Sequence, residues 1–389
     1  MSIVQPLIGC LGIASLFVAA SYAVLALVAV LVWQIFSATP SAPQLPAVTV
    51  LMPLSGAQAN LYERLRSFCR QNHPEYQIVF GVRYLTDPAL PVVKRLIAEF
   101  PSLPIDVVVD PRQHARNFKI PDLITMLSRA RHNVLAVSDS NMFVGPDYLA
   151  NVTAPLLDQS VGLVTCICRG VPTQQICSRL SAIAINEWYV PSVLVAWLFG
   201  YDRYASRHNF CLRRHTLEAI GDPKASASYS TIDHPLGKLI RELGQRVVLS
   251  RRMYSMQRHE LNLQSLVRHE VRWMRTVRAL RPRSFRILFI TFSVPLALIG
   301  VVLSAAQPSL SALAEALFQA TVLARLALHF VNRLLGERPA VHEFWLLPVR
   351  DVLICWAWSR AFFTLGVNSA AATRALPCPP AATLPFRRE

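Results

Sequence analysis

Long hydrophobic runs lie near both ends of the chain. Residues 7–36 are uncharged, and this run is longer than the roughly 20 residues that a helix needs to cross a bilayer. It has neither the basic start nor the short apolar core of a signal peptide. Residues 287–305 and 313–331 are further runs of spanning length, while a weaker run at 346–365 contains charged residues and fits a re-entrant or interfacial helix. We therefore expect membrane helices on both sides of the central region.

The central region has a different pattern, in which short apolar runs of strand character alternate with helices of about ten residues. This alternation predicts a largely parallel sheet with right-handed crossovers. The predicted strands are 48–54, 76–82, 105–109, 133–137, 161–168, 209–213 and 246–249. The predicted helices are 61–71, 89–100, 121–130, 178–199, 217–221, 235–243 and 263–278. The helix at 178–199 is apolar but interrupted by Pro191, and we expect it to lie against the membrane surface.

These patterns divide the chain into four parts. We expect an N-terminal transmembrane helix and linker at 1–46, an α/β domain at 47–285, membrane or interfacial helices at 286–366, and a disordered tail at 367–389.

Composition supports membrane association. Hydrophobic residues make up 53% of the chain and charged residues only 16%, which is too apolar for an ordinary soluble domain. The net charge of +16 favours an anionic partner such as nucleic acid, a membrane surface or an anionic substrate. The arginines cluster between Arg268 and Arg286, beside a predicted membrane helix, so we expect no nucleic-acid partner. The positive-inside rule then places the α/β domain in the cytosol.

Three aspartates follow or precede predicted elements at places where a ligand could reach them. The strand at 133–137 ends in Ser138-Asp139-Ser140-Asn141, Asp87 follows the strand at 76–82, and Asp233 precedes the helix at 235–243. Open α/β sheets bind ligands at the carboxyl ends of their strands. Common structural roles are the alternatives, namely an Asx turn after the strand and a helix N-cap for Asp233.

A basic and aromatic motif, His269-Glu270-Val271-Arg272-Trp273, follows these aspartates on a predicted helix. Taken in this order between membrane helices, the three aspartates and the motif resemble the membrane-bound glycosyltransferases of GT-A fold, specifically the ceramide glucosyltransferase family. Within that family the chain looks closest to bacterial glycosyltransferases associated with hopanoid biosynthesis. Stretches such as Ser67-Phe68-Cys69-Arg70-Gln71 and Val161-Gly162-Leu163-Val164-Thr165-Cys166 carry the closer resemblance, which covers residues 48–365.

The resemblance implies a role for each aspartate. Asp87 matches an acid that helps to hold the nucleotide. Asp139 matches the acid that faces the donor diphosphate, usually through a divalent metal such as Mg²⁺ or Mn²⁺, which prefers oxygen ligands. Asp233 matches the general base that removes the proton of the acceptor hydroxyl.

The motif has implied roles as well. Arg272 would neutralise charge on the departing diphosphate, and Trp273 would offer a flat apolar face to the sugar or lipid. His269 stands at the first position of this motif. Asn117 and Lys119 match a donor-binding Asn-x-Lys pattern, with a solvated loop lysine as the alternative.

The sequence departs from the family pattern at several positions. Asn141 replaces a second acid that many GT-A enzymes carry, although the ceramide enzymes also lack it. Ile232 and His234 flank the predicted base in place of an acid and a tyrosine. His208-Asn209 stands where the hopanoid branch tends to have small residues.

The resemblance therefore implies an inverting transferase that moves N-acetylglucosamine or glucose from a UDP-sugar to a lipid hydroxyl, with a hopanoid polyol or a ceramide-like lipid as acceptor. It also implies a multi-pass protein of the bacterial inner membrane. Two alternatives stay open. One is a catalytically degenerate membrane protein that binds nucleotide sugar or lipid, and the other is a processive polysaccharide synthase, which would need more membrane helices for its channel.

Overall fold

The computed structural model describes residues 4–35, 44–56, 60–109, 125–200, 209–220, 233–258, 260–334 and 341–363. These residues form two compact units that interleave along the chain. The sheet unit takes residues 39–167 and 202–256, and the helical unit takes residues 1–38, 168–201 and 257–365.

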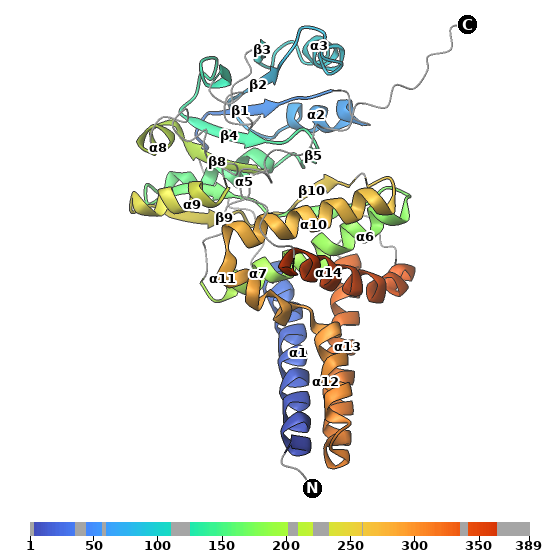
Figure 1. The fold of residues 1–389 in the computed structure, drawn as a ribbon. Helices are drawn as coiled ribbons and strands as arrows, with labels where there is room; N and C mark the ends of the chain where they lie inside the picture. The colour runs from blue at the N-terminus through green and yellow to red at the C-terminus, as the bar shows by residue number, and fades with distance from the viewer. Residues whose placement is uncertain are drawn as a thin grey trace, which may run out of the picture. The chain divides into compact units, whose positions relative to one another are not determined.

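Seven strands form one sheet in the described part of the sheet unit, in the order β3-β2-β1-β4-β8-β6-β9 (Figure 1). Their bounds are β1 Val48–Pro53, β2 Tyr76–Val82, β3 Ile105–Val109, β4 Val134–Ser138, β6 Val161–Thr165, β8 Asn209–Arg213 and β9 Arg246–Leu249. The strand β8 is antiparallel to both of its neighbours, and the other strands are mutually parallel. The predicted α/β class and mostly parallel sheet are confirmed. The sequence did not predict the reversal of β8, or the short antiparallel pair of β5 (Met142–Phe143) and β10 (Tyr254–Gln257).

Successive residues of the central strands point to opposite faces of this sheet and are buried on both. On one face, Leu51, Leu135 and Leu212 belong to a core cluster that also contains Leu236 and Ile240 from α9. The helices of the sheet unit are α2 Leu61–Cys69, α3 Leu90–Glu99, α5 Tyr148–Thr153, α8 Arg214–Ala219 and α9 Asp233–Glu242, with a 3₁₀ turn η1 at Ala154–Leu157. A strand covered on both faces is a rigid support for the loop that follows it.

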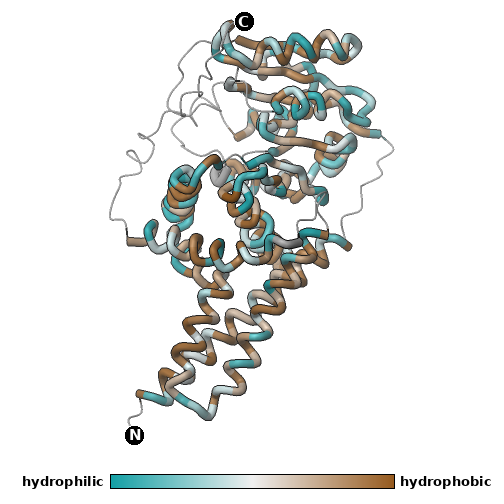
Figure 2. Tube along the Cα trace, turned by 90° about the vertical axis from the view of Figure 1, so that its right-hand side faces the viewer, coloured by the Kyte–Doolittle hydropathy of each residue, from teal (hydrophilic) through white to brown (hydrophobic). Residues whose placement is uncertain are grey.

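Three long apolar helices pack together in the helical unit: α1 (Val4–Ile35), α12 (Ser293–Ser304) and α13 (Ser311–Leu334). Figure 2 shows hydrophobic residues along most of their length. Gly12 and Gly300 lie at the contact of α1 with α12, where a Cβ on Gly12 would come within 2.4 Å of the Ser304 nitrogen. Only small residues allow such close helix packing.

Two helices among the described residues, Val4–Ile35 and Pro308–Leu334, are long and apolar enough to cross a membrane. They correspond to the predicted spans at 7–36 and 313–331. A bent pair, Pro282–Thr291 with Ser293–Ser304, would be a third span if it counts as one.

The predicted helix at 287–305 is broken near its start. The chain bends by 68° at this point, and α11 (Pro282–Ile287), the 3₁₀ turn η4 (Leu288–Thr291) and α12 replace that single helix. Pro295 explains the break, because it cannot donate a hydrogen bond to the carbonyl of Thr291 and its ring crowds the preceding turn.

The predicted helix at 178–199 is also interrupted. It consists of α6 (Ile176–Ala184), a π-helical turn η2 (Ile185–Tyr189) and α7 (Val190–Leu198). Pro191 cannot donate to the Glu187 carbonyl four residues earlier, which favours a locally widened helix.

The rest of the helical unit contains α10 (Leu263–Leu280), α14 (Leu346–Phe363), a short strand β7 (Cys168–Val171), and 3₁₀ turns η5 (Pro308–Leu310) and η6 (Val341–Trp345). The helices α6, α10 and α14 pack on one another. The helix α14 occupies the weak apolar run, and it is not among the candidate spans of the described chain.

Candidate active site

The carboxyl ends of β2, β1 and β4 lie side by side in the sheet unit, because these three strands are parallel neighbours. Asp87 follows β2, and both of its carboxylate oxygens accept from the backbone N–H of Gly56, at 3.1 and 3.3 Å. One of these oxygens also accepts from the Ala89 N–H at 2.8 Å. Asp87 therefore fixes the loop that follows β1, where Gly56 has a left-handed φ of 70°. Its carboxylate keeps lone pairs for a ligand.

Asp139 follows β4 directly, so it lies at the same edge of the sheet. Its loop is held from α2, because the buried Arg64 donates from Nε to the Ser140 carbonyl at 2.9 Å. Burial lowers the pKa of the Arg64 guanidinium, which nevertheless stays charged in proteins. The side-chain oxygen of Asn141 is buried and has no hydrogen-bond partner within the described chain. An amide oxygen in this state is available to coordinate a cation or to accept a hydrogen bond from a ligand.

A buried polar pair, Tyr148 and Asn209, lies beside the end of β4, where the Asp139 loop begins. Asn209, the first residue of β8, pairs with Ser138 across the sheet, and its side-chain oxygen accepts from the Tyr148 hydroxyl. Burial raises the pKa of Tyr148 well above its ordinary value, so the hydroxyl stays protonated and donates. Asn209 thus has a packing role in the sheet, which its position in the sequence did not reveal.

Several predicted site residues lie at or outside the limits of the described chain. Asp233 is the first residue of α9, in keeping with its predicted place before a helix, but its side chain is not described. Asn117, Lys119 and His208 fall outside the described residues.

The basic and aromatic motif lies on α10 in the helical unit. The Trp273 ring meets Trp188 and Tyr189 edge to face, with centroid distances of 5.3 and 5.4 Å. Arg272 is exposed. This arrangement fixes the Trp273 ring by aromatic packing and leaves the guanidinium beside it on the surface.

His269 lies between two arginines. Its Nε2 is 3.1 Å from Nη2 of Arg258, and its Nδ1 is 3.4 Å from Nη2 of Arg272. Arginine only donates, and a neutral imidazole accepts at one nitrogen at a time. His269 can therefore accept from either arginine but not from both. Arg258 is also paired with Glu260 at 2.5 Å, which anchors that side of the contact.

Glu270, in the middle of the motif, turns away from solvent. It forms a buried ion pair of 2.9 Å with Arg350 of α14, and both side chains are almost completely inaccessible. This pair fixes α10 against α14 and thereby sets which face of α10 presents Arg272. The sequence contained one signal for this pair, because Glu270 and Arg350 are opposite charges that lie in two separate segments with many apolar residues.

The structure thus collects the predicted residues in two groups, each within its own unit: Asp87 and Asp139 at one sheet edge, and His269, Arg272 and Trp273 on one helix. Within the described residues no three His, Cys, Asp or Glu side chains form a metal cluster. A metal at Asp139 would need further oxygen ligands, and the unpartnered Asn141 oxygen is one such donor.

Comparison with known proteins agrees with this fold. The solved structure of mannosyltransferase PcManGT from Pyrobaculum calidifontis, in complex with GDP-Man and Mn²⁺, matches 92% of this chain and 100% of that one, with a TM-score of 0.51 and 18% identity. At such low identity the likeness concerns the fold, which is GT-A-like.

Curated relatives are ceramide glucosyltransferases. Ceramide glucosyltransferase 1 of Caenorhabditis elegans is 22% identical over 209 residues, which are 54% of this chain and 45% of that protein. The ceramide glucosyltransferase of Candida albicans is 28% identical over 116 residues, which are 27% of this chain and 21% of that protein. The chain thus spans less than half the length of these relatives. The family model described as glycosyl transferase family 21 matches residues 12–368, and the chain belongs to that family.

Proposed function

We propose that this chain transfers a sugar from a UDP-sugar to a hydroxyl group of a membrane lipid, with inversion at the anomeric carbon. The observation that carries the proposal is the placement of Asp87 and Asp139 after the carboxyl ends of β2 and β4, the two strands that flank β1 in parallel. That edge is where sheets of this class bind nucleotides. Family membership supports the reaction class.

In this proposal the sheet unit binds the donor. Asp87, already bonded to the loop after β1, holds the nucleotide, and Asn117 and Lys119 assist. Asp139 and the Asn141 oxygen would hold a divalent cation such as Mg²⁺ or Mn²⁺, since both offer the oxygen ligands that hard cations prefer. Such a cation supplies charge stabilisation for the diphosphate leaving group.

Asp233 is the proposed general base. It takes the proton of the acceptor hydroxyl, whose oxygen then attacks the anomeric carbon from the face opposite the nucleotide. Arg272 carries a permanent positive charge and stabilises the negative charge of the departing diphosphate, with His269 beside it. Trp273 provides a flat apolar surface for the sugar or the lipid chain.

The acceptor is proposed to be a neutral lipid with free hydroxyl groups, such as a ceramide-like lipid or a hopanoid polyol, and the sugar to be glucose or N-acetylglucosamine. Several relatives are ceramide glucosyltransferases, which supports the ceramide-like class. The helices α1 and α13 would hold the chain in the bacterial inner membrane, with the sheet unit in the cytosol, where nucleotide sugars are made.

Sugar transfer in membranes tests the proposal. Membranes containing the wild type, Asp233→Asn or Asp158→Asn receive radiolabelled UDP-glucose or UDP-N-acetylglucosamine, extracted lipids and Mg²⁺ or Mn²⁺. Asp158 is a matched control, because its side chain is exposed and pairs with Arg246. Labelled lipid should form with the wild type and with Asp158→Asn, and should fall about 10²–10⁴-fold with Asp233→Asn, the usual contribution of a general base.

Two results would contradict the proposal. Equal transfer by Asp233→Asn and the wild type would remove Asp233 from the mechanism. The absence of labelled lipid from every donor, in a folded protein that still binds UDP, would favour a catalytically degenerate protein that only binds nucleotide sugar.

A further inference from the structure

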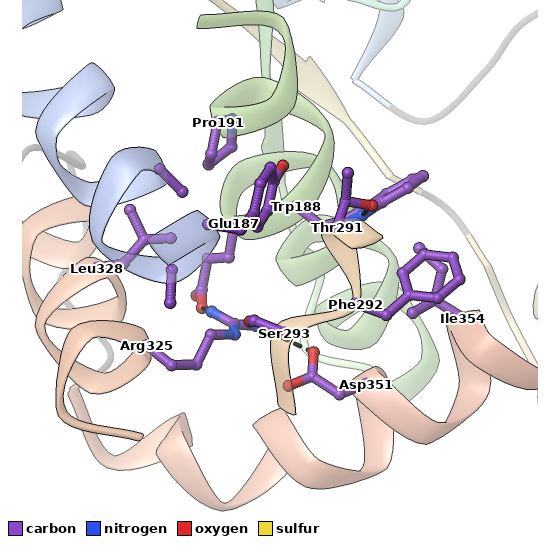
Figure 3. Close-up of a pocket in the computed structure, with 13 residues that line it drawn as sticks. Glu187, Trp188, Pro191, Thr291, Phe292, Ser293, Arg325, Leu328, Asp351 and Ile354 are labelled. Atoms are coloured by element: carbon purple, nitrogen blue, oxygen red, sulfur yellow. Dashed lines mark hydrogen bonds and ion pairs between the residues drawn. The ribbon is translucent and has the colours of Figure 1, made fainter. Parts of the chain in front are cut away.

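The helical unit contains a small polar cavity beside its membrane helices (Figure 3). Its volume is about 20 Å³, which is enough for one water molecule or one hydroxyl group. One side of its wall is apolar, with Ala23, Ala26 and Leu328 among the lining residues. The other side carries Glu187, Arg325 and Asp351, so the cavity is amphipathic.

The charged side is a buried ion network. Arg325 of α13 pairs with Glu187 at 2.7 Å and with Asp351 of α14 at 3.3 Å. His329, one turn further along α13, contacts the second oxygen of Glu187 at 2.7 Å. The side chains of Glu187 and His329 are almost completely inaccessible. The two oxygens of Glu187 are therefore both engaged within the protein.

Asp351 is not fully engaged. Only its Oδ1 is bonded to Arg325, and its buried Oδ2 has no hydrogen-bond partner among the described residues. An ionised carboxylate oxygen in a small enclosed space requires a donor, because leaving it unpaired costs more than an ordinary hydrogen bond. Asp351 lines the cavity, so a ligand with an O–H or N–H group at this place would supply that donor.

Arg325, on the wall of the cavity, lies within the candidate span Pro308–Leu334. From Ser311, where α13 begins, to Arg325 the helix rises about 21 Å at 1.5 Å per residue. The hydrocarbon core of a bilayer is about 30 Å thick. With α13 across a bilayer, the cavity would lie toward the end of the span away from the connector between α12 and α13, where the hydroxyl groups of a lipid lie close below the headgroup level.

Stability alone does not account for such a network. Burying several charges costs more free energy than an apolar core of the same shape, and ionisable residues at membrane depth usually have a function. Glu187 also lies in the π-helical turn, a local widening that is frequent at functional sites.

We propose that this cavity binds a hydroxyl group of a neutral membrane lipid, with Asp351 as the hydrogen-bond acceptor. The identification of this lipid as the acceptor of sugar rests on the proposed function, whereas the binding site itself does not. A positively charged or hydroxylated group fits the unpaired oxygen, and an anionic phosphate does not, because it would face Asp351 and Glu187.

Lipid binding to the purified full-length protein in nanodiscs tests the site. The probes are a long-chain ceramide and the same ceramide with its hydroxyls O-methylated, and retained lipid is counted by native mass spectrometry. Three variants are compared with the wild type. Asp351→Asn weakens the acceptor, Ala26→Val fills the cavity without touching the ion network, and Glu315→Gln is a control on α13, because Glu315 is exposed and accepts a hydrogen bond from Gln319.

The wild type and Glu315→Gln should retain ceramide about tenfold better than its O-methylated form, the effect of one hydrogen bond to a charged acceptor. Asp351→Asn should lose this preference, and Ala26→Val should bind both probes more weakly. Equal retention of the two probes by the wild type, unchanged in Asp351→Asn and Ala26→Val, would overturn the site and assign the cavity to a resident water only.

A transfer assay in the same nanodiscs separates this inference from the proposed function. Selective ceramide binding that depends on Asp351, without any sugar transfer, would retain the site and refute the transferase. Sugar transfer with a KM for ceramide that is the same in the wild type, Asp351→Asn and Ala26→Val would retain the transferase and refute the site.

Discussion

The two units of this protein bury charge in opposite ways. In the described part of the sheet unit the buried charged side chains are arginines, Arg64 and Arg213, and they donate to backbone carbonyls. In the helical unit carboxylates are buried as well, and each is matched by a cation: Glu187 by Arg325, and Glu270 by Arg350.

This difference distinguishes acids that can bind a ligand from acids that stabilise the fold. The described aspartates at the sheet edge, Asp87 and Asp139, are only half-buried, so a ligand can reach them. The buried acids Glu187 and Glu270 of the helical unit are compensated by arginines and hold helices together. Acid substitutions should therefore affect activity in the sheet unit and stability in the helical unit.

The largest effect is expected from Glu187→Gln. It leaves Arg325 buried with a neutral partner, and breaking a buried ion pair costs about 3–5 kcal/mol. Chemical unfolding of the detergent-solubilised protein measures this loss, with Glu315→Gln as the control on the exposed face of α13. A loss below about 1 kcal/mol would mean that the network contributes no more than a surface pair.

The pH dependence of stability provides a second measure of the same carboxylate. Burial alone would raise the pKa of Glu187, but the charge of Arg325 and the contact with His329 outweigh it and hold the pKa below its ordinary value of 4.5. Its stabilisation is therefore present above the unfolded-state pKa and is lost as the pH falls through the lower folded-state value. The wild type should lose stability toward pH 4 more steeply than Glu187→Gln.

A large effect on activity, and not on stability, is expected from Asp139→Asn. Sugar transfer should fall about 10²–10³-fold, as when one group that stabilises transition-state charge is removed. The melting temperature should stay unchanged, because Asp139 is half-buried at the end of β4. Transfer assays and thermal unfolding of the same preparation check both parts. A variant that keeps its activity but melts earlier would reverse the comparison between the units.

An intermediate effect is expected from Arg64→Met, which removes the buried donor to the Ser140 carbonyl. Losing a hydrogen bond from a charged group costs about 1.5–3 kcal/mol. Because the loop after Asp139 would loosen, the KM for UDP-sugar should rise more than kcat falls. Arg70→Met, at the exposed end of α2, is the control. Equal kinetics in both variants would show that the loop does not depend on Arg64.

The smallest effect is expected at the surface of the sheet unit. Arg246 and Asp158 lie 2.6 Å apart, but more than half of each side chain is exposed. Hydrogen bonds from Ser160 and the charge of Arg246 hold the pKa of Asp158 below its ordinary value, so any stabilisation exists at neutral pH and disappears as the pH falls. Asp158→Asn should leave the melting temperature unchanged at pH 7, as measured by circular dichroism.

The parts of the fold that depend on local pattern could be predicted from the sequence. The strands that precede Asp87 and Asp139 are apolar runs with clear ends, and parallel neighbours bring such ends to one edge. The reversal of β8 depends on pairing with β4 and β6, which are distant in sequence, and no local feature of residues 209–213 reports it.

The ion network of the helical unit was harder to predict, because in the sequence its charged residues only lower the hydropathy of the apolar runs. In the sequence, Glu187 is a polar interruption of an apolar helix, and Asp351 weakens the hydropathy of the last run. Each charge acquires its meaning from a partner far along the chain, since Arg325 contacts both acids. A search for opposite charges in separate apolar segments would have suggested the network.

The close packing of α1 against α12 has a consequence for how the protein is made. Gly12 is synthesised first, and its neighbour Gly300 leaves the ribosome roughly 15–60 s later at ordinary rates of 5–20 residues per second. During that interval the small-residue face of α1 lacks the partner that it has in the folded protein. The helix α1 is thus synthesised well before α12, and a chain that ends before α12 would leave the Gly12 face of α1 unpaired.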